Sequence, residues 1–288
     1  MSAVLFDLPG PRAARRHRMI AAATVLGLLA LAALVVWKLW TEEQFTADKW
    51  EPFVTPKIVD LLLGALWDTV RAAAFAVLLA VGVGLLFGVG KLSEHALVRA
   101  PAWIFVEFFR AVPLLMVIIA LFGLYGRDIT SFWCLVIGLT LYNGAVLAEV
   151  FRAGVNAVPR GQAEAAYAIG MRKTQVMTIV LLPQAIKIMI PAIISQCVVV
   201  LKDTSLGFYI LAPGLTTAGR LVWNSFGNKF ATALVLAATY IVLNSILSWL
   251  ATKAQRRLTG DTAPLAVVGM DQSAQGGGDR GGDGAGHG

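Results

Sequence analysis

Long apolar runs recur along this chain and constrain its fold more than any other feature. About twenty consecutive apolar residues are enough to cross the hydrocarbon core of a bilayer as an α-helix. Of the 288 residues, 58% are hydrophobic and only 14% are charged, whereas soluble domains carry about 25% charged residues. The pattern predicts an all-α polytopic membrane protein. Six candidate spans lie at about 19–40, 58–90, 101–125, 131–151, 184–201 and 230–250.

Basic residues between these runs predict the orientation. Residues 1–18 form a basic N-terminus, and the run at 19–40 exceeds the roughly 7 to 15 apolar residues of a signal peptide, so we expect a retained first helix. With that N-terminus in the cytoplasm, the connector at 41–57 lies outside the inner (plasma) membrane and both chain termini lie inside. The positive-inside rule agrees, because the predicted inner segments carry Lys91, Arg99, Arg152, Arg160, Arg172, Lys173, Lys253, Arg256 and Arg257.

The remaining spans form one predicted membrane core at 58–255, which includes a cytoplasmic loop at 156–183. Residues 256–288 are rich in glycine and aspartate and lack apolar periodicity, so we expect a disordered cytoplasmic tail. The second span is lined by small residues, which indicate close helix packing in a membrane. A flexible gating helix is the alternative for this stripe, which consists of Ala80, Gly82, Gly84, Gly88 and Gly90.

Several function classes are not expected from the residue pattern. The net charge is +7, but the basic residues lie between apolar runs and are not interleaved with aromatics, so we expect no nucleic acid as partner. Cysteines and histidines are dispersed, which predicts no metal site; they are Cys134, Cys197, His17, His95 and His287. No catalytic constellation of His, Ser or Cys is visible. We therefore expect neither an enzyme nor a cofactor bound by this chain.

The loop at 156–183 contains a short predicted helix. Pro159 suits a first helical turn, and Gly170 suits a left-handed C-terminal cap. Between them, one helical face carries Gln162, Ala165, Ala166 and Ile169. A helix that protrudes into the cytoplasm cannot bury this face in its own membrane core, so we expect a partner surface to cover it. The alternative, a helix lying on the bilayer, usually inserts bulky Trp, Phe or Leu.

The same loop carries a spaced motif. It reads EAA, three residues, G, nine residues, a hydrophobic residue, one residue and LP, supplied by Glu164, Ala165, Ala166, Gly170, Val180, Leu182 and Pro183. This resembles the hallmark of the binding-protein-dependent ABC importer permeases. The resemblance implies a coupling helix that docks into a cleft on an ATPase subunit. The residues it assigns to ATPase coupling are Arg160, Gly161, Gln162, Glu164, Ala165, Ala166, Gly170, Leu182 and Pro183.

Further segments resemble the polar amino acid branch of that family. They are the EFFR and PLL pieces at 107–115, the FRAG and PRGQ pieces at 151–162, and LKDTSL at 201–206. The resemblance covers about residues 58–255. The sequence at 4–11 and the extra first span are similar to the D-type permease of actinobacterial glutamate importers, which favours glutamate over arginine, glutamine or histidine as the transported solute.

The resemblance also implies the partners. They are an ABC ATPase dimer that uses ATP and Mg²⁺, a second homologous permease subunit forming a heterodimer, an extracytoplasmic amino-acid-binding protein, and membrane lipid. The chain has no P-loop of its own, because Leu92 follows Lys91 where serine or threonine is needed to bind magnesium. A secondary transporter or channel is the alternative with the same composition, but the chain lacks the paired interrupted helices of an inverted repeat.

Charged residues in or near the spans are candidates for a solute pathway. Lys202, Asp203, Thr204 and Ser205 follow an apolar run directly, and Gly207, Pro213 and Gly214 then interrupt any continuous helix. Irregular polar backbone at membrane depth is tolerated where it lines protein or water. An ordinary outer turn is the alternative. Glu107 and Arg110 are a second candidate, with ion pairing on one helical face as the alternative. Asp68 and Arg71 share that spacing and are expected to pair.

Overall fold

The computed structural model describes residues 11–259, and every regular element within them is helical. The elements are α1 (Pro11–Thr41), α2 (Ala47–Trp50), η1 (Glu51–Val54), α3 (Pro56–Leu92), α4 (Ala96–Ala111), α5 (Leu114–Tyr125), α6 (Ser131–Asn156), α7 (Arg160–Ala168), α8 (Lys173–Gln175), η2 (Val176–Leu181), α9 (Leu182–Asp203), η3 (Thr204–Ile210), α10 (Leu215–Phe226) and α11 (Lys229–Thr259). Five helical stretches are long and apolar enough to cross a membrane, and the bent pair α4 and α5 brings the possible total to six. The all-α membrane fold is therefore confirmed.

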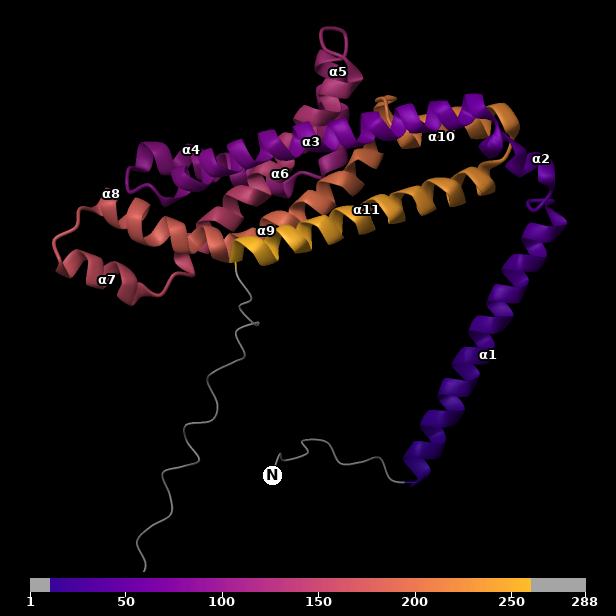
Figure 1. Cartoon of the computed structure of the whole chain (residues 1–288), viewed down its shortest axis with the longest axis horizontal. Helices are drawn as coiled ribbons and strands as arrows, with labels where there is room; N and C mark the ends of the chain where they lie inside the picture. The colour runs from indigo at the N-terminus through magenta and orange to yellow at the C-terminus, as the bar shows by residue number, and fades with distance from the viewer. Residues whose placement is uncertain (1–10, 260–288) are drawn as a thin grey trace, which may run out of the picture.

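A bundle of long helices forms the core, in which α3, α6, α9 and α11 run along the long axis (Figure 1). Its largest buried cluster joins Ala72 and Ala76 of α3 to Leu135 and Leu139 of α6 and to Ile118 of α5. The predicted pairing of Asp68 with Arg71 is confirmed at 2.8 Å between a carboxylate oxygen and a guanidinium nitrogen. The core thus sits between α3 and α6, with α9 and α11 alongside.

Small residues let α3 and α6 approach closely. A Cβ atom added at Gly84 would lie 2.6 Å from the Cβ of Leu147, and one at Gly88 would lie 2.9 Å from the Cβ of Phe151. Both distances are shorter than normal carbon contacts. Gly82 differs, because an added Cβ there meets nothing within 4 Å. The expectation of close packing therefore holds at Gly84 and Gly88.

The span expected at 101–125 is not one straight helix. Helix α4 begins earlier, at Ala96, and ends at Ala111, and α5 leaves it at an angle of 102°. The cause is Pro113, because a residue before proline is pushed out of the helical region. Val112 accordingly has the extended angles φ −80° and ψ 131°. Helix α5 has 12 residues, or about 18 Å, and points away from the bundle in Figure 1.

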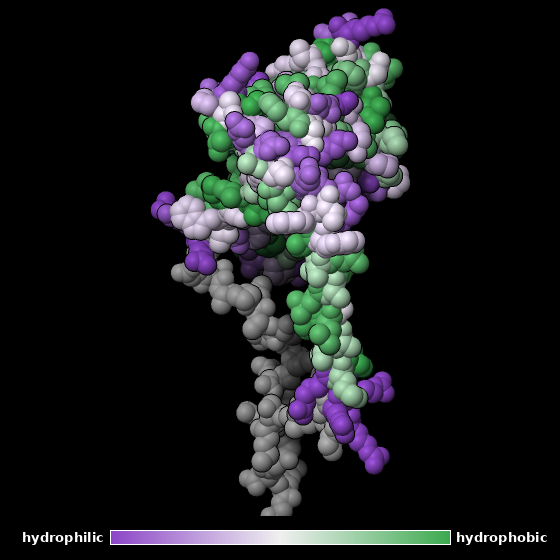
Figure 2. Space-filling model, turned by 90° about the vertical axis from the view of Figure 1, so that its right-hand side faces the viewer, coloured by the Kyte–Doolittle hydropathy of each residue, from purple (hydrophilic) through white to green (hydrophobic). Residues whose placement is uncertain are grey.

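Helix α1 lies apart from the bundle, and none of its most apolar window is buried. Figure 2 shows its apolar side chains as a continuous green column that ends in hydrophilic residues. The helix begins at Pro11, eight residues before the span predicted from residue 19. Helices can extend beyond the hydrocarbon into the headgroup region, where basic residues are tolerated.

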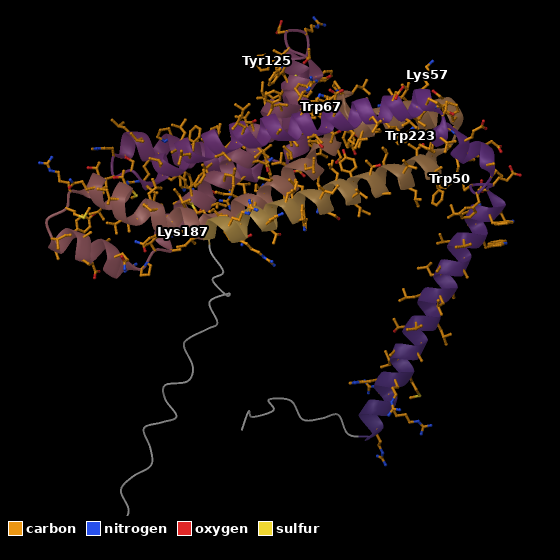
Figure 3. The ribbon with its side chains drawn as sticks, viewed as in Figure 1. Trp50, Lys57, Trp67, Tyr125, Lys187 and Trp223 are labelled. Carbon is orange, nitrogen blue, oxygen red and sulfur yellow. The ribbon has the colours of Figure 1, made fainter. Side chains whose placement is uncertain are left out.

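The connector after α1 is folded against the end of the bundle opposite α7. Phe45 packs edge-on against Phe230 of α11, and the Asn228 side chain donates a hydrogen bond of 2.9 Å to the Lys49 carbonyl. Trp50, Lys57 and Trp223 gather at this end, whereas Lys187 lies toward the α7 end (Figure 3). Tryptophans commonly mark a membrane interface. This end is therefore a candidate for one of the two interfaces.

The C-terminal boundary also differs from the expectation. Helix α11 continues to Thr259, so residues 256–259 are helical and do not belong to a disordered tail. The rest of the predicted tail and the N-terminal segment 4–10 lie outside the described residues.

Candidate functional site

Helix α7 forms much as its sequence predicts, at one end of the bundle (Figure 1). Pro159 is the N-cap, one position before the helix, with φ −55° and ψ 131°. At the other end, Gly170 has φ +81°, and its N–H donates to the Tyr167 carbonyl at 2.9 Å, while Met171 N–H donates to the Ala166 carbonyl at 3.2 Å. This pair of hydrogen bonds is a Schellman cap, which requires a left-handed residue after the helix.

The face of α7 that we expect a partner to cover is partly buried by this chain. Ala166 is buried by the chain itself, because α7 packs on the π-helical segment η2. Gln162 and Ala165 remain exposed, and Ile169 is 79% exposed. The expectation that this chain covers none of the face is therefore wrong for Ala166, whose small side chain allows α7 to approach η2. The exposed remainder is an uncovered surface at the end of the bundle.

The other predicted coupling residues surround this surface. Arg160, Gly161 and Glu164 are exposed on α7 itself. Leu182 and Pro183 open α9, which continues from η2 without a break because Leu181 is helical. The motif thus places its first half on α7 and its second half at the beginning of the span that α7 leads into.

An ion pair connects this loop to the neighbouring helices. Lys173 of α8 pairs with Glu94, which lies between α3 and α4. The hydrogen bond from Lys173, together with its charge, holds the pKa of the Glu94 carboxyl below its ordinary value. Both side chains are exposed, so the pair contributes little stability. It nevertheless shows that α8 lies beside the end of α3.

Valine at Gly170 is expected to impair coupling more than asparagine at the same position. A positive φ costs a residue with a Cβ about 1 to 2 kcal/mol, and most for a β-branched one, whereas asparagine tolerates it. No atom lies within 4 Å of an added Cβ, so backbone strain and not a clash causes the effect. Uptake and ATPase binding by the complete transporter measure this. Equal uptake for Gly170→Val and Gly170→Asn would contradict the role of the cap.

Of the four polar residues predicted at the end of α9 as candidates for a solute pathway, only two line a common cavity. Lys202 and Ser205 line a cavity of about 510 Å³ together with Tyr240 and Asn244 of α11. Thr204 is buried and donates its hydroxyl to the Leu201 carbonyl at 2.7 Å, and Asp203 does not line this cavity. The predicted interruption of the helix is present: α9 ends at Asp203, the 3₁₀ helix η3 follows, and Leu211 after it has φ +54°.

Asn244 was not predicted from the sequence, although it follows Tyr240 by one helical turn within an apolar span. Its amide nitrogen donates to the Tyr240 carbonyl at 2.8 Å. Its amide oxygen is buried without a hydrogen-bond partner among the described residues. A buried acceptor without a donor is unfavourable, so Asn244 is an unsatisfied polar side chain in the lining of this cavity.

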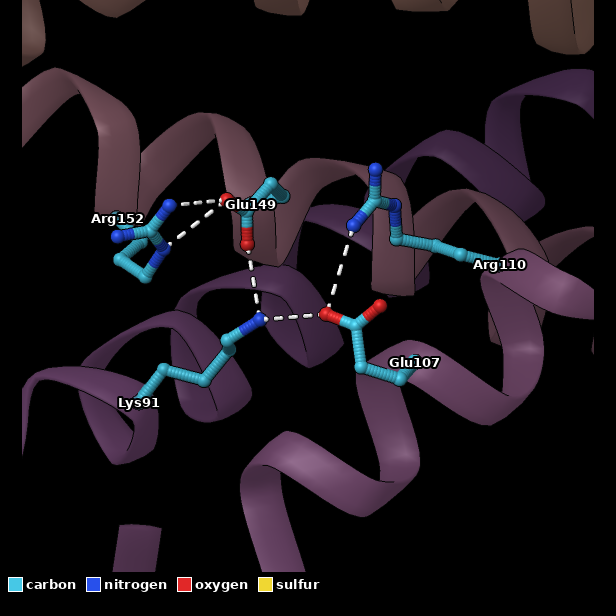
Figure 4. A network of polar contacts seen from close by, with 5 residues as sticks. All are labelled: Lys91, Glu107, Arg110, Glu149 and Arg152. Carbon is cyan, nitrogen blue, oxygen red and sulfur yellow. Dashed lines mark hydrogen bonds and ion pairs between the residues drawn. The ribbon is translucent and has the colours of Figure 1, made fainter. Parts of the chain in front are cut away.

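Glu107 and Arg110 do not line the cavity beside Lys202. They are part of an ionic cluster that joins three helices (Figure 4). Lys91 of α3 contacts Glu107 of α4 at 3.1 Å and Glu149 of α6 at 2.9 Å. Arg152 holds Glu149 at 2.5 Å, and Arg110 lies 3.6 Å from Glu107. The pairing of Glu107 with Arg110 is therefore present. Lys91 and Glu149 were missed, because their separation along the chain gives no local pattern.

Comparison with known proteins places the chain in a family. Residues 80–260 match the family described as binding-protein-dependent transport system inner membrane component. The glutamate transport system permease protein GluD of Corynebacterium glutamicum is 37% identical over 232 residues, which cover 78% of this chain and 85% of that protein. The histidine/lysine/arginine/ornithine permease HisM of Salmonella typhimurium is 28% identical, over 67% and 86% of the two chains.

Solved structures of ABC transporters contain chains with the same fold. A chain of an amino acid ABC transporter crystallised with histidines superposes with a TM-score of 0.66 at 30% identity, over 70% of this chain and 95% of that one. A chain of the inward-facing MetNI methionine transporter gives a TM-score of 0.61 at 19% identity, which shows the fold alone. This chain therefore belongs to the binding-protein-dependent transport system inner membrane components, as a multi-pass permease subunit whose ATP is hydrolysed by a separate subunit.

Proposed function

We propose that this permease imports a polar amino acid, and specifically glutamate, at the expense of ATP. The glutamate permease GluD supports this choice, because its match covers most of both chains. Family membership supports an ATP-driven importer over the alternative of a secondary transporter or channel. We thus infer the substrate of this chain from its similarity in sequence to GluD.

The proposed coupling to an ATPase rests on the uncovered surface of α7, which is formed by Gln162, Ala165 and Ile169 at one end of the bundle. We propose that this surface docks on the ATPase dimer, which binds ATP and Mg²⁺, while this chain binds no cofactor. Because only the short segments α8 and η2 connect α7 to α9, movement of the docked helix is transmitted to the membrane-spanning part of the chain.

The proposed orientation puts α7 in the cytoplasm together with both chain termini. Basic residues near the α7 end support it through the positive-inside rule. The opposite end, with α2 and α10, then receives solute from an extracytoplasmic binding protein. We further propose that a second, homologous but different permease completes the pathway. The mass of the purified complex tests the heterodimer, and two identical permease copies would contradict it.

The cavity beside Lys202 is the proposed contact for the solute. The ammonium of Lys202 complements a glutamate carboxylate, and the Asn244 side chain lies in the lining of the same cavity. Ser205 adds a hydroxyl that can donate to the carboxylate. Of the four predicted residues, Lys202 and Ser205 are therefore the proposed solute contacts. Asp203 and Thr204 are proposed to shape the end of α9.

Methionine at Lys202 is expected to raise the half-saturating glutamate concentration of uptake by roughly tenfold or more, because a charge-assisted hydrogen bond contributes about 1.5 to 3 kcal/mol. Lys187→Met is the control, since Lys187 is also an exposed lysine of α9 but does not line this cavity. Uptake of labelled glutamate by proteoliposomes, in competition with arginine, glutamine and histidine, provides the measurement. Unchanged kinetics for Lys202→Met would refute this contact, and preference for another amino acid would refute glutamate as substrate.

A further inference from the structure

A small cavity beside the ionic cluster has no part in the mechanism above. It has a volume of about 300 Å³ and lies between the α7 ends of α3, α4 and α6. Helix α4 contributes Arg99, Trp103 and Glu107, which follow one another at four-residue spacing and therefore share one face. The rest of the lining is Lys91 of α3 together with Glu149 and Arg152 of α6.

The cavity has more positive than negative charge. Its two carboxylates, Glu107 and Glu149, already share Lys91, and Glu149 also accepts two hydrogen bonds from Arg152. Arg99 donates only to the backbone carbonyls of Ser93 and Glu94, each at 3.3 Å. Among the described residues, no carboxylate is paired with Arg99. The unbalanced charge makes the cavity suitable for an anion.

The cavity borders a surface that is apolar and uncovered in this chain. On α4, Ile104 and Phe108 are exposed, and they follow Arg99 along the helix, farther from its α7 end. Trp103, which lines the cavity, is 55% exposed, and tryptophan is enriched where hydrocarbon meets headgroups. Arg152 lies four residues before the end of α6, about 6 Å along the helix axis. The cavity is thus near headgroup depth, with an apolar surface leading away from it.

We propose that this cavity binds the phosphate headgroup of an anionic phospholipid from the cytoplasmic leaflet. Arg99 donates to the phosphate oxygens, Trp103 packs at the glycerol level, and an acyl chain lies along the exposed apolar residues of α4. Basic pockets between membrane helices on the cytoplasmic side are suited to such headgroups. A free phosphate ion offers the same oxygens but leaves the apolar surface uncovered. The leaflet assignment rests on the proposed orientation.

The test uses the complete transporter in nanodiscs of phosphatidylglycerol mixed with phosphatidylcholine, without amino acid or ATP. Native mass spectrometry counts the phosphatidylglycerol molecules that each complex retains. Arg99→Gln is expected to weaken retention of one such lipid about fivefold, the factor for one basic residue near an anionic surface. Arg99→Lys is expected to preserve most of it. The control Arg256→Gln removes an exposed arginine of α11 that does not line the cavity and is expected to change nothing.

A parallel arm separates lipid from free phosphate. The lipid-free complex in detergent is titrated with inorganic phosphate, and no binding that depends on Arg99 is expected. Equal retention of phosphatidylglycerol by the native complex and by Arg99→Gln would overturn the proposal, as would Arg99-dependent binding of phosphate alone. Because neither arm measures transport, failure here is distinct from failure of the glutamate assignment.

Discussion

Replacement of Lys91 by methionine is expected to destabilise the membrane bundle by about 3 kcal/mol. The Lys91 side chain is only 6% exposed and is the cation shared by Glu107 and Glu149. Without it, two carboxylates remain close together, one on α4 and one on α6, with Arg110 and Arg152 as their remaining partners. Removing one partner of a buried pair costs about 3 to 5 kcal/mol, and the loss is expected at the low end because each carboxylate keeps an arginine partner.

The temperature at which the detergent-solubilised complex loses its monodisperse chromatographic peak measures this effect. Lys38→Met is the matched control, because Lys38 also forms an ion pair, with Glu42 at 2.6 Å, but both side chains are exposed. An exposed pair contributes about 0 to 1 kcal/mol, so little change is expected there. Equal losses for the two variants would show that the cluster does not hold the helices together.

Leucine at Gly88 is expected to prevent α3 from packing against α6, so that little folded permease reaches the membrane. An added Cβ already lies 2.9 Å from the Cβ of Phe151 and 3.0 Å from the Ala148 carbonyl oxygen. This carbonyl belongs to the backbone of a buried helix, so it cannot move away from the added atoms as a flexible side chain could. Overpacking a core costs about 1 to 3 kcal/mol and sometimes more, and here the longer side chain must separate two helices.

Gly82→Leu provides the control on the same helix, because nothing lies within 4 Å of an added Cβ at that position. The amount of monodisperse permease recovered from membranes is expected to fall by about an order of magnitude for Gly88→Leu and to stay near normal for Gly82→Leu. Normal recovery of Gly88→Leu would indicate that α3 and α6 do not form the close contact described above.

Local patterns predicted the parts of this structure that depend on neighbouring residues. The left-handed cap at Gly170 is predictable because the helical periodicity extends to Ile169 and a glycine follows it directly. Pro113 carries the same kind of local signal, since proline in an apolar run predicts a break, whereas hydropathy alone predicts one span at 101–125. Hydropathy alone reports whether a segment fits the membrane and not whether it is straight.

Contacts between distant segments lay beyond the sequence. Lys91 and Glu149 are 58 residues apart, and only the close packing of α3 on α6 brings them together. The cavity shared by Lys202 and Asn244 likewise depends on α9 lying beside α11. Sequence reasoning therefore located candidate charges but not their partners. It also could not foresee that η2 covers Ala166, because that contact depends on the path of the chain between α7 and α8.

The central claim is that α7 couples this permease to a separate ATPase that drives glutamate import. The most direct test reconstitutes the permease pair, the ATPase and the binding protein in proteoliposomes and measures uptake of labelled glutamate. Uptake is expected only with ATP on the α7 side and with the ATPase present, and it should persist when ionophores dissipate ion gradients. Uptake driven by a sodium or proton gradient without ATP or the ATPase would contradict the account.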